Sequence, residues 1–359
     1  MKLLFLQALI GSLGFARATN FIQGSDFVPP YTDEDNRLDG QWVDKVSVSP
    51  RPEKCLALAL SDSLNVGPYQ AGVIRELVKK LRASGDSEYQ VISGVSLGAI
   101  NAHIFAQYPR GQELEAAEKV VDFWLKLSEK NNQLIRSWNW GILYGFFYQN
   151  SLYDATALYN FIEDYFAGTT LKKHVNLGNT NLLNGQFHSF KEHHSSDELV
   201  QVMKASLAFP GVFKAVEAFD SLWITGSSVY EIDVIQPINH CRDLGYSDKD
   251  IVVDVILIGN PHLHHVLAKI YNAFAIAART FEVQKYYERM FGLLRAKGGH
   301  PDVNFRHVIG PQREMANKVV PVEMTRSEAL HQIKLGAKDV IQYFAQQSDK
   351  EPTDTHTYV

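Results

Sequence analysis

Ser96 is the residue of this chain whose surroundings most strongly suggest chemistry. It lies in the run QVISGVSLGAINAHIF (residues 90–105), with Gly94 two positions before it and Gly98 two positions after it. A sharp turn from a strand into a helix exposes the turn serine as a nucleophile, and glycines at these two positions remove Cβ atoms that the turn would crowd. The helix amides that follow favour developing negative charge. The pattern predicts a nucleophile elbow at Ser96.

The elements around Ser96 read as alternating strands and helices. CLALAL (55–60) predicts a short buried strand, GPYQAGVIRELVKKLRA (67–83) an amphipathic helix and YQVISG (89–94) the next strand. This order implies a right-handed parallel unit in which helices cover a sheet. Further along, we expect helices within 112–166, 264–296 and 326–345, a hairpin over 214–226 that turns at Asp220–Ser221, and a long buried strand over 250–259.

Composition narrows the class of protein. The chain has 359 residues, 45% of them hydrophobic, which is enough for one large domain or two smaller ones. A net charge of -5 and the absence of a long Lys/Arg run argue against a nucleic-acid partner. Two cysteines, Cys55 and Cys241, exclude a disulfide framework and a cysteine-based metal site, and whether they pair stays open.

The N-terminal segment resembles a targeting sequence. Lys2, an apolar run from Leu3 to Phe15 and the small-x-small site Ala16-Arg17-Ala18 predict a signal peptide over 1–18 and a protein that is secreted or in the secretory-pathway lumen. A membrane anchor is the alternative, but the apolar run is short of the roughly 20 residues that span a bilayer. We expect an extended arm over 19–54, one domain over 55–345 with its motifs in 55–259 and a helical part in 260–345, and a mobile tail over 346–359.

Several segments between Cys55 and Gly259 resemble the patatin-like phospholipases. The matching segments are YQAGVIRELVKKL (first helix), GVSLGAINA (nucleophile elbow), SLYDATALYNFI (mid-domain), KASLAFPGVFKAVEAFDSLWITGS (the run that ends in the family's catalytic D-G-G/A) and SDKDIVVDVILIGN (a late strand). The resemblance implies a three-layer α/β/α fold with a mainly parallel sheet. It also implies a lipid acyl hydrolase that acts on a glycerolipid or fatty-acyl ligand with a Ser-Asp dyad, without a cofactor, a metal or a catalytic histidine.

Two parts of the family's machinery are replaced in this divergent sequence. The dyad aspartate falls on Thr225, whose hydroxyl cannot accept the proton of Ser96 near neutral pH. The glycine-rich oxyanion loop aligns with Asp62-Ser63-Leu64-Asn65-Val66-Gly67, where only Gly67 is kept. Losing one oxyanion donor costs roughly a hundred- to a thousand-fold in rate. We therefore expect weak or lost hydrolase activity, with non-catalytic lipid binding, storage or interaction on the same fold as the alternative.

Substitutes for the missing base are sparse. Glu231 and Asp233 lie just beyond the motif, but a helix start or cap explains them equally well. Asp62 could face Ser96 across the cleft, whereas Asp220 is explained by its turn. Among the histidines, including His103, no spacing singles out a base.

Three other features have both a functional and an ordinary interpretation. The aromatic segment SWNWGILYGFFYQN (137–150) could line an acyl groove or meet a peripheral membrane surface, but we expect it to pack in the core. PHLHHVL (261–267) lacks a carboxylate or cysteine at metal-ligand spacing and is interpreted as a solvated helix start. KYYERMFGLLRAK (285–297) could meet a membrane, but packing on the sheet is the simpler interpretation. The sequence leaves the oligomeric state open.

Overall fold

A mainly parallel sheet forms the centre of the computed structural model, which describes residues 53–63, 65–259, 263, 273–313, 315, 320 and 322–348. The strand order is β10-β9-β1-β2-β5-β8-β7, with β6 also paired to β5. The pairs from β10 to β5 are parallel, and β6, β7 and β8 join antiparallel at the other side. The strands are β1 (Cys55–Leu60), β2 (Val91–Val95), β5 (His174–Asn181), β6 (Phe187–Phe190), β7 (Val216–Ala218), β8 (Ser221–Thr225), β9 (Ile251–Ile256) and β10 (Asn304–Ile309).

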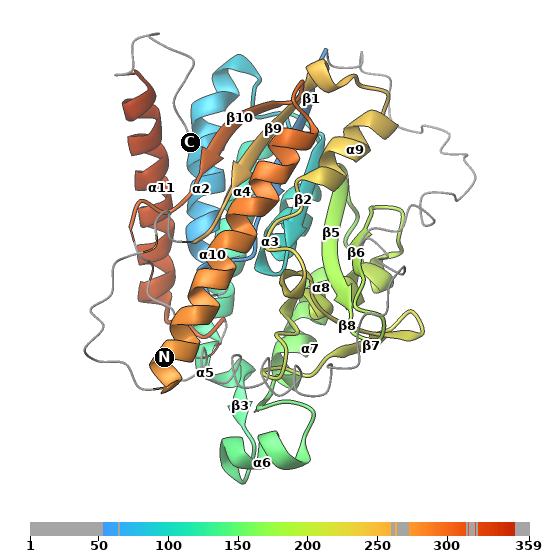
Figure 1. Ribbon diagram of the computed structural model, residues 1–359, viewed down its shortest axis with the longest axis vertical. Coiled ribbons are helices and arrows are strands. Elements are labelled where there is room, and N and C mark those ends of the chain that lie inside the picture. Colours follow the sequence, from blue (N-terminus) through green and yellow to red (C-terminus); the bar gives the residue numbers. More distant parts are fainter. Residues whose placement is uncertain are drawn as a thin grey trace.

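Helices cover both faces of this sheet (Figure 1). On one face the core includes residues of α2 (Gly67–Leu81), α3 (Leu97–Ala106), α4 (Glu113–Glu129), α7 (Thr156–Phe166), α8 (Ser196–Leu207) and α11 (Arg326–Ser348). On the other face it includes residues of α9 (Ile235–Asp243) and α10 (Ala273–Gly299). The three-layer α/β/α fold expected from the sequence is confirmed.

The sequence of β1 shows why both faces are covered. Leu56, Leu58 and Leu60 belong to the first core, whereas Cys55, Ala57 and Ala59 belong to the second. Successive side chains of a strand point to opposite faces, so a continuous apolar run gives each face a buried row.

A small extension carries the aromatic segment away from the sheet. It consists of α5 (Asn131–Leu134), a two-stranded ribbon of β3 (Arg136–Ser137) and β4 (Tyr153–Asp154), and α6 (Gly141–Tyr148). Figure 1 shows α6 at the far end of this extension, at the bottom of the view. None of the described helices is both long enough and apolar enough to cross a bilayer.

The described residues test whether the cysteines pair and where the expected hairpin turns. Cys55 and Cys241 form a disulfide that joins the start of β1 to α9. The β7–β8 hairpin turns at Phe219-Asp220, one residue earlier than expected, and both residues have positive φ. The segments 1–52 and 349–359, which include the expected signal peptide, most of the arm and most of the tail, lie outside the described residues, as does nearly all of PHLHHVL.

Candidate functional site

Ser96 forms a nucleophile elbow between β2 and α3. Its backbone has φ 57° and ψ -126°, a region that residues other than glycine seldom adopt. A Cβ on Gly94 would lie 2.3 Å from the carbonyl oxygen of Gly98, and one on Gly98 would lie 2.4 Å from that of Ser61. The two glycines are required because the turn brings α3 against the ends of β1 and β2, as the sequence predicted.

The hydroxyl of Ser96 is isolated inside the protein. The residue is fully buried, and its Oγ has no hydrogen-bond partner among the described residues. A serine hydroxyl becomes a strong nucleophile when an adjacent base accepts its proton. In this conformation the described residues supply Ser96 with no hydrogen-bonded base, and they also shield it from solvent.

Thr225 lies at the same edge of the sheet as Ser96, at the end of β8. Val95 pairs with Gly178 in β5, and the next residue of β5, Asn179, pairs with Thr225. Since neighbouring strands lie about 4.8 Å apart, Thr225 is roughly 10 Å from Ser96 between Cα atoms. The register therefore places Thr225 two strands from the nucleophile.

The hydroxyl of Thr225 is engaged within its own turn. Its Oγ1 lies 3.1 Å from Ser227 Oγ and accepts a hydrogen bond from the Ser227 amide at 3.5 Å. Thr225 is buried, so its side chain is not in contact with solvent. A neutral hydroxyl in this position can hold the turn together, but it cannot act as a general base.

The loop before α2 does not have the geometry of a glycine-rich anion cradle. The Asp62 amide donates to Glu231 O at 2.8 Å, and the Val66 amide donates to Ser63 O at 2.7 Å. None of the described loop residues has positive φ, and Leu64 lies outside the described residues. Two of the loop amides are therefore already used within the protein.

Two loop residues that align with the family's oxyanion loop have other surroundings. Gly67 begins α2, where an added Cβ would lie 2.1 Å from the ring of Trp124, so this glycine is required for helix packing. Asp62 is buried beside the loop backbone. A buried carboxylate near an oxyanion would oppose its charge.

Glu231 is held by a lysine of α10. Lys285 Nζ lies 2.9 Å from Glu231 Oε1 and donates to Ser227 O at 2.9 Å. Burial opposes the charge on Lys285, but Glu231 and Glu288 outweigh it and raise the lysine pKa. The charged lysine holds Glu231 in an ion pair, and no hydrogen bond to Ser96 is found among the described residues.

Asp233 supports the start of α9. Its Oδ1 accepts a hydrogen bond from the Gln236 amide at 3.1 Å, and its backbone carbonyl accepts one from Ser93 Oγ at 2.7 Å. The residue is buried. Asp233 thus holds the first turn of α9 from the position before the N-cap Val234, and these contacts do not include Ser96.

A buried polar chain behind the elbow was missed from the sequence. Trp124 Nε1 donates to Asn101 Oδ1 at 2.8 Å, Asn101 Nδ2 donates to Gln70 Oε1 at 2.8 Å, and Gln70 Nε2 donates to Ser61 O at 3.1 Å. These bonds link α4, α3 and α2 to the end of β1. Asn101, five residues after Ser96 in a mainly apolar helix, is the sequence signal that could have indicated it.

The aromatic segment is exposed, so the expectation that it packs in the core is wrong. Trp140 is 81% exposed, Leu143 73%, Phe147 69% and Tyr148 75%. Its anchor is Trp138, whose Nε1 donates to Ser151 O at 3.0 Å. The helix is too short and the extension too narrow to bury both sides of α6.

Residues 65–232 match the family described as patatin-like phospholipase. Among solved structures, the chain is similar to VipD from Legionella pneumophila, with 12% sequence identity and a TM-score of 0.39, over 82% of this chain and 67% of that chain. No curated protein matches the chain. The matched region, residues 65–232, includes the elbow and the strand that ends at Thr225, and it is similar to the patatin-like phospholipase family.

Proposed function

We propose that this protein binds a glycerolipid or fatty-acyl ligand on its patatin-like domain and hydrolyses it slowly or not at all. The observation that carries the proposal is the isolation of Ser96 Oγ, which has no hydrogen-bond partner among the described residues. In a serine protease, removing one member of the catalytic set costs roughly ten thousand- to a million-fold in rate. The family fold supports lipid as the ligand class, and the replaced residues support weak chemistry.

An active hydrolase is the second candidate, because the backbone at Ser96 has the strained conformation of a nucleophile elbow. Ser96 has positive φ, and the glycines that permit the turn are both present. Strained backbone of this kind clusters at active sites. In this alternative, substrate binding opens the site and brings a carboxylate such as Asp62, or a group from a partner, to the serine.

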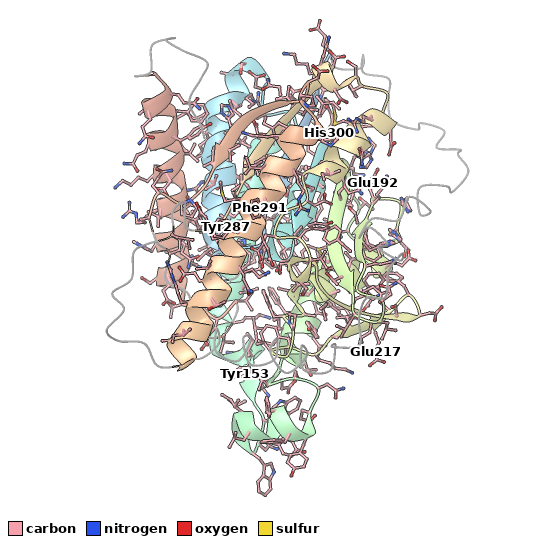
Figure 2. All side chains as sticks on the ribbon, viewed as in Figure 1. Tyr153, Glu192, Glu217, Tyr287, Phe291 and His300 are labelled. Carbon is pink, nitrogen blue, oxygen red and sulfur yellow. A yellow bond between two sulfur atoms is a disulfide. The ribbon has the colours of Figure 1, made fainter. Side chains whose placement is uncertain are left out.

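A lipid surface is the partner that fits α6. Trp140, Leu143 and Phe147 place apolar surface in solvent. Figure 2 shows the side chains of α6, at the bottom of the view, projecting from the body of the protein. Aromatic side chains with one apolar and one polar part are favoured at membrane interfaces. We propose that α6 contacts the lipid surface from which the ligand is taken.

An extracytoplasmic location is part of the same proposal. The N-terminal sequence has the features of a signal peptide, and Cys55 and Cys241 form a disulfide. Disulfides persist in oxidising compartments. Both features support a protein that is secreted or resides in the secretory-pathway lumen.

Labelling by a fluorophosphonate probe tests the proposal. The wild-type protein is expected to label no faster than Ser96→Ala, with Ser84→Ala, at an exposed serine, as the matched control. Native mass spectrometry of the same preparation should show a bound lipid. Rapid labelling that is lost only in Ser96→Ala would favour the hydrolase. A protein that carries no lipid, and that binds none when lipid is added, would contradict lipid binding.

A further inference from the structure

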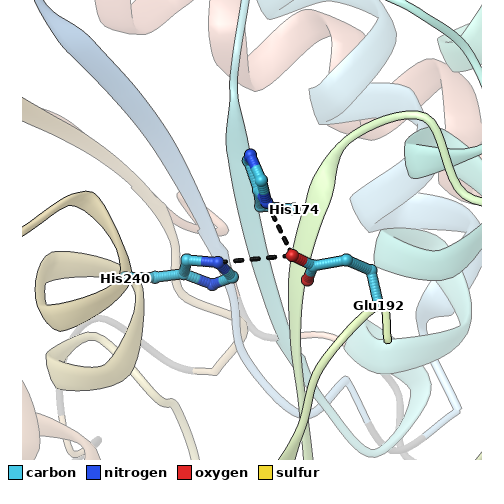
Figure 3. Close-up of side chains that lie close together, drawn as sticks. All are labelled: His174, Glu192 and His240. Atoms are coloured by element: carbon cyan, nitrogen blue, oxygen red, sulfur yellow. Dashed lines mark hydrogen bonds and ion pairs between the residues drawn. The ribbon is translucent and has the colours of Figure 1, made fainter. Parts of the chain in front are cut away.

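Two histidines and a glutamate meet at the opposite end of the sheet from Ser96 (Figure 3). His174 is the first residue of β5, Glu192 follows β6, and His240 lies in α9. His174 Nδ1 lies 2.6 Å from Glu192 Oε1, and His240 Nε2 lies 3.4 Å from the same oxygen. All three atoms are within 4.8 Å of one another. Imidazole nitrogen and carboxylate oxygen are ligand types that Zn²⁺ takes in proteins.

The outer atoms of the cluster already have protein partners. The Val175 amide donates to Glu192 Oε2 at 2.9 Å, and His240 Nδ1 lies 3.1 Å from Asn176 Oδ1. The amide nitrogen of Asn176 is directed to Ser189 Oγ at 3.3 Å, which orients its oxygen toward His240. At protein metal sites, such outer contacts fix the tautomer and the orientation of the ligands.

In the tautomer of His240 that carries its proton on Nδ1, an electron pair on Nε2 faces a carboxylate. If Nδ1 donates its proton to Asn176, the neutral ring has a lone pair on Nε2, which points at Glu192 Oε1. Two lone pairs repel unless a proton or a cation lies between them. A cation between the two atoms resolves the repulsion.

We propose that His174, Glu192 and His240 bind one Zn²⁺ ion through Nδ1, Oε1 and Nε2, with water as the fourth ligand. Bonds of about 2.0–2.1 Å in a tetrahedron separate ligand atoms by about 3.3 Å. The His240–Glu192 distance of 3.4 Å already matches this value. The His174–Glu192 distance of 2.6 Å would have to lengthen, and the two histidine nitrogens lie within 4.8 Å of each other. The side chain of His174 is 39% exposed, so solvent can supply the water.

The position of the site separates the ion from Ser96. His174 pairs with Val91 at the start of β2, whereas Gly178 pairs with Val95 beside the elbow. Four residues of strand separate the two ends by about 13 Å, so the ion does not reach Ser96. It would join β5, the end of β6 and α9, next to the disulfide at Cys241.

Isothermal titration of Zn²⁺ into the chelator-treated full chain, prepared without a polyhistidine tag, tests the proposal. We expect one ion per chain, at least a tenfold loss of affinity in Glu192→Gln and His240→Gln, and a ten- to hundredfold loss in Asn176→Ala. His193→Ala and the triple change at His262, His264 and His265 are matched controls that should bind normally.

Loss of a ligand and loss of the fold can be told apart in this experiment. Circular dichroism reports whether each variant is folded, and the wild-type titration stands alone. No Zn²⁺ binding by the wild-type chain would overturn the proposal, and so would binding that folded Glu192→Gln and His240→Gln retain in full. Zinc should also raise the melting temperature of the wild-type chain but not of Glu192→Gln.

Discussion

Acidification should destabilise this protein through His103, a histidine buried in α3. His103 packs edge-on against Phe166, and its Nδ1 lies 3.2 Å from Gln107 Nε2. Burial lowers the pKa of His103 from 6.5 to about 3. The unfolded chain therefore binds a proton that the folded chain rejects, and stability is lost as the pH falls from about 6.5 toward about 3. Between pH 7 and pH 5 this amounts to about 2 kcal/mol, at about 1.4 kcal/mol per pH unit below 6.5.

Urea unfolding at pH 7 and pH 5 measures this loss by difference. His103→Gln has no imidazole to protonate, so its free energy of unfolding should depend on pH by about 2 kcal/mol less than that of the wild type. His331→Gln, at an exposed position of α11, controls for the removal of a histidine. An equal pH dependence in wild type and His103→Gln would refute the reasoning, because it would mean that His103 can charge without unfolding the protein.

Three further outcomes follow from the elbow, the dyad position and α6. Gly98→Ala should lower the free energy of unfolding by about 3 kcal/mol in urea titration, because its Cβ would overlap backbone oxygens, whereas Gly298→Ala, with open space around it, should not destabilise. Thr225→Asp should raise the rate of fluorophosphonate labelling at least tenfold by returning a carboxylate to the dyad position; an unchanged rate would show that the position cannot serve Ser96. Phe147→Glu should reduce cosedimentation with phosphatidylcholine vesicles several-fold, and Leu183→Glu, at another exposed apolar position, should leave it unchanged.

The elbow could be predicted from sequence because local geometry determines it. Gly94 and Gly98 are required by contacts within a few residues of Ser96 and by the adjacent end of β1, and an apolar strand followed by small helical residues encodes that arrangement. The alternating layers were likewise predicted from apolar runs such as CLALAL, which fill both faces of a covered sheet.

The strand β5 could not be recognised in the same way. Its sequence, HVNLGNTN, contains Asn176 and Asn179 at fully buried positions. Asn179 donates to Val202 O and accepts from Ser206 Oγ, partners that are far away in the chain. A polar strand of this kind is stabilised by tertiary hydrogen bonds that no local pattern reveals. The same reason hid the cluster of His174, Glu192 and His240, whose members come from three separate elements.

The aromatic segment was expected to be buried, but it is exposed. Residues 137–150 are apolar enough for a core, but whether they are buried depends on what covers them. In the structure they lie on a narrow two-stranded extension that leaves Trp140 81% and Phe147 69% exposed. An exposed apolar patch of this kind indicates an interaction surface, which composition alone cannot distinguish from a core.

Hydrolysis of phosphatidylcholine by the purified chain, compared with Ser96→Ala under the same conditions, tests the central claim most directly. If Ser96 lacks a base, the two proteins should release fatty acid at rates within about tenfold of each other, since the loss of a base alone costs about ten thousandfold or more. Release by the wild type that exceeds that of Ser96→Ala by a thousandfold would contradict the account.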